Sequence, residues 1–235
     1  MLTIEPFLIP SDDAARLRTL QQYDVHSPFT EPVFDEMVAL TARIFSLPIS
    51  LIALVDKTEV RYIGNYGMPA NMVQSRQEAL CATAILHNKA IVYRDLIAEK
   101  DPFITSQAAQ AAHTNSIRFY AAAALRMPDQ RNIGTLCIVD YHPRTLSAEE
   151  EQMLELLAEL ISHVLVVRHL HQTQPVGGEA AWHTMRTQLE AEVQGLTALV
   201  RYMLTRYGVQ VPVPTDVLAQ VERRIYDLHE VLRGE

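Results

Sequence analysis

Two cysteines are the strongest nucleophiles in this sequence, and their surroundings decide what chemistry they could do. Cys81 lies in a run that predicts a helix over residues 76–87, and Cys137 lies in a run that predicts a strand over residues 132–139. A thiol that reduces a sulfoxide or senses peroxide needs a low pKa and a resolving partner. A cysteine on an apolar face is more commonly a small buried hydrophobic residue. We therefore expect both thiols to be buried and reduced, and keep redox chemistry as the alternative.

Charged side chains beside apolar runs form a second group of candidates. Arg76, Asp95, Arg118 and Asp140 each adjoin a predicted buried element. An unpaired buried charge is costly, so we expect salt bridges, with Arg118–Asp95 or Arg118–Asp140 as the pairs. Contact with a bound ligand is the alternative role for the same residues.

Aromatic residues complete the candidate set. Tyr66, Phe119 and Tyr120 lie in apolar runs, where their rings could line a cavity or fill the core. The sequence does not separate these roles, because both place the ring in an apolar environment. The candidate ligand-binding residues are therefore Tyr66, Arg76, Cys81, Asp95, Arg118, Phe119, Tyr120, Cys137 and Asp140.

A histidine near the C-terminal end belongs to a longer motif. The run His183-Thr184-Met185-Arg186-Thr187-Gln188-Leu189 resembles the phosphoacceptor box of sensor histidine kinases, commonly written H-E-L-R-T-P-L. The resemblance implies a helical hairpin over residues 179–235 with His183 as candidate phosphoacceptor. It departs from the family at two positions, since Thr184 replaces the acidic general base and Gln188 the helix-kinking proline. The chain also lacks a glycine-rich nucleotide loop, so we expect no autokinase activity.

The elements that position these residues follow from hydrophobic periodicity, caps and breakers. Ser11 can cap a first helix, and Ser147 with Glu150 forms a capping box that opens a long helix. Helices are expected over residues 11–22, 30–45, 76–87, 105–113, 147–172, 182–203 and 215–233. Strands are expected over residues 49–55, 60–66, 90–93, 119–127 and 132–139.

The long helix and the segments after it suggest how the chain is organised. Its two neighbouring apolar stripes call for two partners, which we take to be its own sheet and a second subunit. Two further helices bury little by themselves, so we expect a homodimer in which two hairpins form a four-helix bundle. The predicted units are an N-terminal helical segment (residues 1–27), a sensor domain (28–172), a linker (173–178) and a dimerisation hairpin (179–235).

Five ordered blocks within residues 28–167 resemble the GAF domain, a small-molecule sensor of bacterial signalling proteins. The blocks are Leu47-Pro48-Ile49-Ser50-Leu51-Ile52-Ala53-Leu54-Val55-Asp56, Arg76-Gln77-Glu78-Ala79-Leu80-Cys81-Ala82, Val92-Tyr93-Arg94-Asp95, Ile117-Arg118-Phe119-Tyr120-Ala121 and Gly134-Thr135-Leu136-Cys137-Ile138-Val139-Asp140. The resemblance implies an α+β fold with a GAF-like central antiparallel sheet flanked by helices, followed by the C-terminal antiparallel two-helix hairpin.

The specialised ligands of this family match the sequence poorly, so the cofactor is unknown. The Asn88-Lys89 pair fits the cyclic-nucleotide pattern, but Gln107-Ala108 stands where that pattern has two acids. Neither cysteine has the neighbouring histidine that covalent tetrapyrrole attachment needs. The histidines nearest to the predicted sheet fall at the ends of elements, which makes them poor haem ligands: His87, His113 and His142. We expect no metal site.

Composition and charge exclude several classes of function. The formal net charge of −8 argues against nonspecific binding to nucleic acid or to anionic membranes, since both reward a basic surface. No apolar run approaches the roughly 20 residues that span a bilayer. The N-terminus also lacks the pattern of a signal peptide. We expect a cytoplasmic protein.

Together these patterns predict a non-enzymatic signalling protein of the bacterial two-component kind. Binding at the sensor sheet would shift the register or tilt of the helix over residues 147–172, and the hairpin would report that shift. The expected partners are a second copy of the chain and a response regulator or histidine kinase. The alternatives are phosphotransfer at His183, thiol reduction of the free methionine sulfoxide reductase type, and an adaptor that forms mixed bundles with a kinase.

Overall fold

Six antiparallel strands form the centre of the computed structural model, which describes residues 4–23, 31–69 and 72–233. Their order across the sheet is β3-β2-β1-β6-β5-β4, so the contact of β1 with β6 joins the two halves of the sheet. The α+β architecture predicted from the sequence is confirmed. The strands are β1 (Ile49–Val55), β2 (Glu59–Tyr66), β3 (Val73–Ser75), β4 (Ile91–Tyr93), β5 (Phe119–Arg126) and β6 (Asn132–Asp140).

β1 and β6 occupy the centre because they are apolar on both faces. Every residue of β1 is buried, and so is every residue of β6 except Asp140 at its end. Gly134 allows the close approach of these strands, since a Cβ at this position would lie 2.1 Å from the carbonyl oxygen of Ala53. A larger residue at Gly134 would therefore force the two strands apart.

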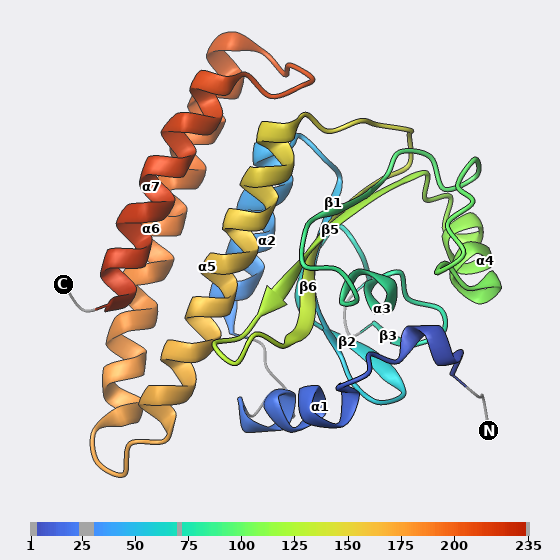
Figure 1. Ribbon diagram of the computed structural model, residues 1–235. Coiled ribbons are helices and arrows are strands. Elements are labelled where there is room, and N and C mark those ends of the chain that lie inside the picture. Colours follow the sequence, from blue (N-terminus) through green and yellow to red (C-terminus); the bar gives the residue numbers. More distant parts are fainter. Residues whose placement is uncertain (1–3, 24–30, 70–71, 234–235) are drawn as a thin grey trace.

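Two long helices cover one face of the sheet: α2 (Pro32–Ile44) and α5 (Ala148–Gln172). Figure 1 shows them packed side by side against the strands. The capping box at the start of α5 is confirmed, because the Ser147 hydroxyl accepts from the Glu150 amide and the Glu150 carboxylate accepts from the Ser147 amide. We call the side of the sheet that carries α2 and α5 the helical face.

The C-terminal helices α6 (Gly178–Tyr207) and α7 (Thr215–Arg233) form the predicted hairpin, but they pack on α2 and α5 of the same chain (Figure 1). Trp182, Leu196 and Ile225 belong to the same apolar cluster as Phe34 and Leu154. The premise that a second copy must cover the hairpin is therefore wrong, because the chain itself supplies the partner helices. Dimerisation stays a prediction. The expected linker is a turn over residues 173–177 between two packed helices.

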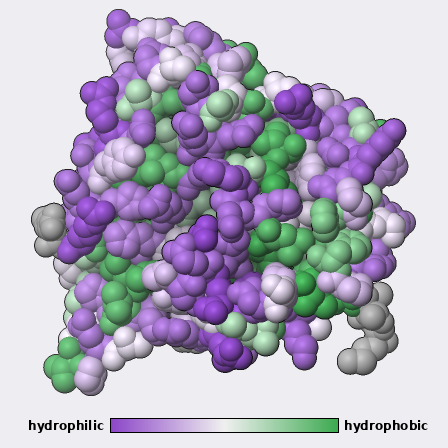
Figure 2. Space-filling model, in the orientation of Figure 1, coloured by the Kyte–Doolittle hydropathy of each residue, from purple (hydrophilic) through white to green (hydrophobic). Residues whose placement is uncertain are grey.

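Short elements cover the opposite face of the sheet, which we call the cavity face: η1 (Pro6–Leu8), α3 (Cys81–Ala84) and α4 (Ser106–Thr114). Helix α1 (Asp13–Gln22) instead packs at the border of the helical face through Leu20. Figure 2 shows mostly polar side chains over the hairpin and more apolar ones over the part of the molecule that holds α3 and β3. Exposed apolar residues include Val73 of β3, and Ile97 and Phe103 between β4 and α4.

The predicted helix over residues 76–87 is wrong, since only α3 within it is α-helical. The residues before α3 use their polar groups elsewhere: the Gln77 carbonyl accepts from the Thr105 hydroxyl, and the Gln77 side chain accepts from the Glu5 amide. The sequence analysis also missed β3, and the residue before α1 is Asp12, not Ser11. The predicted start of the second helix at Thr30 lies outside the described residues.

Candidate functional site

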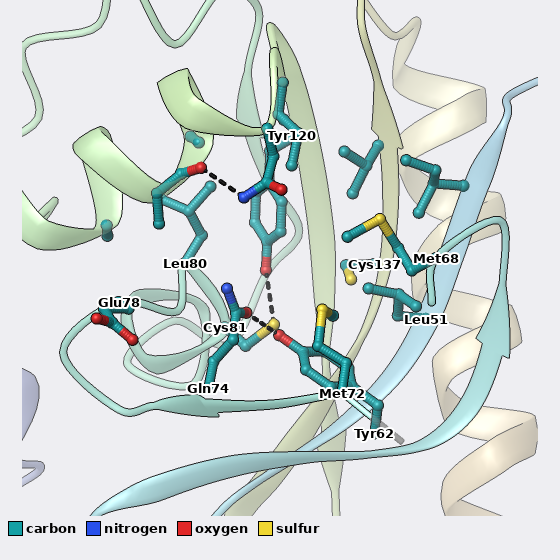
Figure 3. Close-up of a pocket in the computed structure, with 17 residues that line it drawn as sticks. Leu51, Tyr62, Met68, Met72, Gln74, Glu78, Leu80, Cys81, Tyr120 and Cys137 are labelled. Carbon is teal, nitrogen blue, oxygen red and sulfur yellow. Dashed lines mark hydrogen bonds between the residues drawn. The ribbon is translucent and has the colours of Figure 1, made fainter. Parts of the chain in front are cut away.

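A small cavity lies between the cavity face of the sheet and helices α3 and α4. Its volume is about 50 Å³, and Figure 3 shows the side chains that surround it. Strands β1, β2, β5 and β6 form its floor, and alanines of α4 form part of its roof. A water needs roughly 10–15 Å³ measured in this way, so the cavity has room for a few water-sized groups. A ligand of a few non-hydrogen atoms, or one end of a larger ligand, fits this space.

The polar groups in the cavity wall include two thiols and two phenols, together with the side chains of Gln74, Glu78 and Asn115. Cys81 and Cys137 are free and buried, which confirms the expectation of reduced, buried cysteines. The Tyr120 hydroxyl donates to Cys81 Sγ at 3.4 Å, and the Tyr62 hydroxyl donates to the Gln74 side-chain oxygen. Figure 3 shows these side chains converging from β2, β3, β5, β6 and α3.

The surroundings of the two thiols make them chemically unequal. A hydrogen bond from Cys137 lowers the pKa of Cys81 to about 7, against the effect of burial and with help from the Tyr120 hydroxyl. The same hydrogen bond, together with burial, raises the pKa of Cys137 well above its ordinary value. Burial also raises the pKa of Tyr120, so this phenol stays a donor. Cys81 is therefore the thiol that ionises first, and the thiolate is the nucleophilic form.

Only three of the residues nominated from the sequence line the cavity: Cys81, Tyr120 and Cys137. Tyr66 and Phe119 lie on the helical face instead. Phe119 is fully buried in the cluster of that face, and the guanidinium carbon of Arg43 lies 5.6 Å from the centre of the Tyr66 ring. Both rings therefore belong to the packing of α2 and α5 against the sheet.

The nominated charges form structural pairs outside the cavity. Arg118 donates to Asp95 through Nε at 2.7 Å and Nη2 at 2.6 Å, which confirms one of the expected pairs. This bidentate contact lowers the pKa of Asp95. The Asp140 side chain accepts from the His142 amide, and only its backbone carbonyl contacts the Arg118 amide. The alternative Arg118–Asp140 salt bridge is therefore not formed.

Arg76 is buried and ties the N-terminal segment to the sheet. Its Nη1 and Nη2 each lie 3.1 Å from an oxygen of Asp13, and Nη2 donates to the Leu8 carbonyl at 2.8 Å. Arg16 donates to the same carboxylate through Nε at 2.7 Å. Burial opposes ionisation of Asp13, but the hydrogen bonds from both arginines outweigh it and lower its pKa. Arg76 thus has a structural role.

Sequence reasoning missed Tyr62, which reaches the cavity, and chose Tyr66, which does not. Strict alternation along β2 would place both rings on the same side of the sheet. The pairing of β1 with β2 shifts register between Ile52 and Ala53, which pair with Gly64 and Tyr62. A bulge of this kind reverses the alternation, so the two tyrosines face opposite sides. Nothing in the local sequence pattern marks this position as a bulge.

The remaining candidate, His183, lies on an exposed part of α6, where its Nδ1 is 3.2 Å from Arg186 Nη2. It is far in sequence and in fold from the cavity. Among the described residues, no group of three or more histidine, cysteine or acidic side chains could hold a metal ion. No helix in the described part of the chain is long and apolar enough to cross a membrane.

Known proteins similar to this chain include one curated relative and several solved structures. The chain is 30% identical over 157 residues to a cyclic di-GMP phosphodiesterase of Pseudomonas aeruginosa, and the match covers 65% of this chain but only 25% of the relative. The GAF domain of Thermosynechococcus elongatus PixJ aligns with a TM-score of 0.49 at 16% identity, covering 72% of this chain and 96% of that one. The GAF domain of an Acinetobacter phosphoenolpyruvate-protein phosphotransferase aligns with a TM-score of 0.49 at 14% identity, covering 68% and 97%.

The family model described as a GAF domain matches residues 30–166, which is more than half of the chain. The match begins at the start of α2 and ends within α5, so it spans the whole sheet, the cavity and both helices of the helical face. The chain belongs to the GAF domain family.

Proposed function

We propose that this chain is the sensory part of a signalling protein, and that a small molecule binds in the cavity between the sheet, α3 and α4. The observation that supports this function is the composition of the cavity wall. Two thiols and two phenols face one small space whose wall is mostly apolar and also includes Gln74, Glu78 and Asn115. A few placed polar groups in an apolar pocket are typical of ligand sites.

A path for the signal starts in the cavity wall and ends at the hairpin. Cys137 lies in β6, and the chain leaves β6 toward the buried pair of Arg144 and Glu150 at the start of α5. The Glu150 carboxylate also accepts from the Val213 amide at 3.1 Å, in the loop between α6 and α7. A ligand that moves the end of β6 would therefore act on α5 and on the hairpin loop together, provided that it binds two arrangements with different affinity.

One pair of substitutions in α4 tests the cavity. Ala112 lines the cavity, and Ala109 is exposed one turn earlier on the same helix. Leucine has the same helix propensity at either position, so the two variants differ in what the new side chain contacts. Native mass spectrometry of the protein purified from its host cells should show a co-purified small molecule on the wild type and on Ala109→Leu. Ala112→Leu should lose it. A ligand mass retained by Ala112→Leu places the binding elsewhere and contradicts the proposal.

The adjacent thiols also support the alternative of a reductase for free methionine sulfoxide. In that reaction the two thiols would form one S–S bond and release two electrons and two protons, which convert the sulfoxide to a thioether and water. Turnover of free methionine sulfoxide with excess dithiothreitol would be measured for the wild type, Cys81→Ser and Cys137→Ser. Activity that vanishes in both variants supports this alternative, and the absence of turnover in the wild type excludes it.

Phosphotransfer at His183 and assembly into homodimers are further proposals for the hairpin. The exposed position of His183 supports access by a phosphorylated response regulator. Incubation with labelled regulators should then transfer label to the wild type and not to His183→Ala. Sedimentation equilibrium at micromolar concentration tests the dimer. A wild type that stays unlabelled would contradict phosphotransfer at His183, and a monomeric mass would contradict the homodimer.

A further inference from the structure

Two histidines meet at the seam between α5 and α7, away from the cavity. His163 Nδ1 and His229 Nδ1 lie 3.0 Å apart, which is hydrogen-bond distance. The ring planes differ by 21° and the ring centres are 5.3 Å apart, so the imidazoles also stack. His229 is buried and His163 half-buried. The two imidazoles therefore pack against each other in the interface between the helices.

The chemistry of this contact depends on protonation. Two facing Nδ1 atoms can share only one hydrogen, so one ring donates and the other must offer a lone pair. When both rings are protonated, two N–H groups and two positive charges face each other. The contact is then repulsive, and the partly buried position keeps water from screening it.

The groups around the pair favour the neutral state. Burial is the main cause that lowers the pKa of both imidazoles, and the positive charge of Arg233 on α7 acts in the same direction. Each ring also faces the other, and His163 lowers the pKa of His229. Glu159, one turn before His163 on α5, opposes these effects without overcoming them.

Several other charged side chains near the seam form pairs of their own. Lys89, Arg126 and Glu155 share the wall of a groove with His163, and Lys89 Nζ lies 3.3 Å from Glu155. On α6, which packs against α7, Arg186 and Glu190 pair with each other at 3.5 Å. Among the described residues, no carboxylate forms a salt bridge with either imidazole.

The pair is a polar contact that joins α7 to α5, in addition to the apolar packing between the two helices. At the start of α7 the loop is held by the hydrogen bond from the Val213 amide to Glu150. Between the two contacts, Met153 and Leu156 of α5 lie beside Leu218 of α7 along a groove. Loss of the histidine contact would loosen the C-terminal half of α7, which would then be held on α5 by the apolar packing of Ile225, Leu228 and Leu232.

We propose that His163 and His229 form an acid-operated latch, which holds α7 on α5 at neutral pH and releases it when both rings are protonated. The direction of the pH dependence follows from the lowered pKa values of the two imidazoles. The folded state prefers neutral imidazoles, so this contribution to stability is fully present above the unfolded value of about 6.5 and is lost as pH falls through the folded values.

Hydrogen exchange of the full chain tests the latch. Protection of the backbone amides in the second half of α7 would be compared at about pH 7.5 and about pH 5.5, after correction for intrinsic exchange. Wild type should lose protection severalfold on acidification. The control His142→Gln, which removes an exposed histidine, should lose as much. His163→Asn/His229→Asn, whose amides can bond but not titrate, should lose much less. Equal loss in the double variant overturns the latch.

The wild type alone provides a second readout if the double variant does not fold. Titration of the ring protons by NMR should show two histidines with lowered, coupled pKa values, and the amide shifts of α7 should change in the same pH range. Two ordinary, independent histidine titrations, or α7 shifts that stay constant through the titration, overturn the proposal. These outcomes do not depend on the cavity ligand.

Discussion

The two faces of the sheet are covered in different ways. The long helices α2 and α5 close the helical face, α6 and α7 pack on top of them, and large aliphatic and aromatic side chains fill the space beneath. Short elements close the cavity face, where many buried residues are small. They include Ala79, Cys81, Ala82, Ala84, Ala108, Ala122 and Cys137.

Because of this difference, we expect the helical face to contribute most of the stability and the cavity face to provide the space for a ligand. Small side chains under short helices cannot fill the interior to the density of a packed core, so a cavity remains on that face. The helical face buries a larger set of apolar side chains, so it should contribute more to the free energy of unfolding. Substitutions on the two faces test this difference.

The largest effect is expected from truncation of the helical core. Phe34 is 1% exposed at the centre of the cluster on the helical face, and Phe34→Ala should lower the free energy of unfolding by about 4 kcal/mol. Leu80→Ala beside the cavity should cost only about 2 kcal/mol, because one side of Leu80 already faces open space. Urea denaturation measures both. A larger loss for Leu80→Ala reverses the comparison.

The buried carboxylate at the start of α5 should give the next largest effect. Glu150 is fully buried and lies 2.9 Å from Arg144 Nη2, so Glu150→Gln leaves a buried guanidinium without its counter-charge. We expect a loss of about 3 kcal/mol by chemical denaturation. The matched control is Glu149→Gln, one residue earlier and exposed, which should cost far less. Similar losses for both variants would show that Glu150 acts only through the helix dipole.

On the cavity face, ionisation of Cys81 should have a smaller effect on the free energy of unfolding, and this effect should depend on pH. The pKa of Cys81 is lowered from 9.0 to about 7, so the folded state favours the thiolate. Its contribution to stability is present above the unfolded pKa and is lost as pH falls through about 7. Ultraviolet thiolate absorbance should show this transition in the wild type.

Two cysteine variants assign that transition. Cys81→Ala should abolish it, and Cys137→Ala should move it to higher pH, because the hydrogen bond from Cys137 is the main cause of the lowered pKa. A transition that stays near neutrality in Cys137→Ala would show that the two thiols do not interact.

The smallest effect is expected on the outer surface of the hairpin. Arg224 Nη2 lies 3.4 Å from a Glu192 oxygen, and both side chains are more than two-fifths exposed. Exposed pairs contribute little, so Arg224→Gln should change the free energy of unfolding by no more than about 0.5 kcal/mol. A loss comparable to that of Glu150→Gln would show that the hairpin depends on its surface charges.

Most of the secondary structure follows from local patterns in the sequence. The capping box at Ser147 and Glu150, the apolar runs of β1 and β6, and the periodicity of α7 each depend on residues close together in the chain. The helix expected over residues 76–87 failed because the Gln77 carbonyl bonds to Thr105, a contact that no local pattern contains.

Ordered motifs and the cost of isolated charges were enough to predict the family, the burial of both cysteines and a salt bridge of Arg118 with Asp95 or Asp140. Tertiary contacts settled which side chains meet, and Arg118 pairs with Asp95. The bulge in β2 selected Tyr62 over Tyr66 for the cavity, and the fold brought the two thiols together. It also covered the C-terminal hairpin with helices of its own chain, because apolar stripes specify that they must be buried but not against which partner.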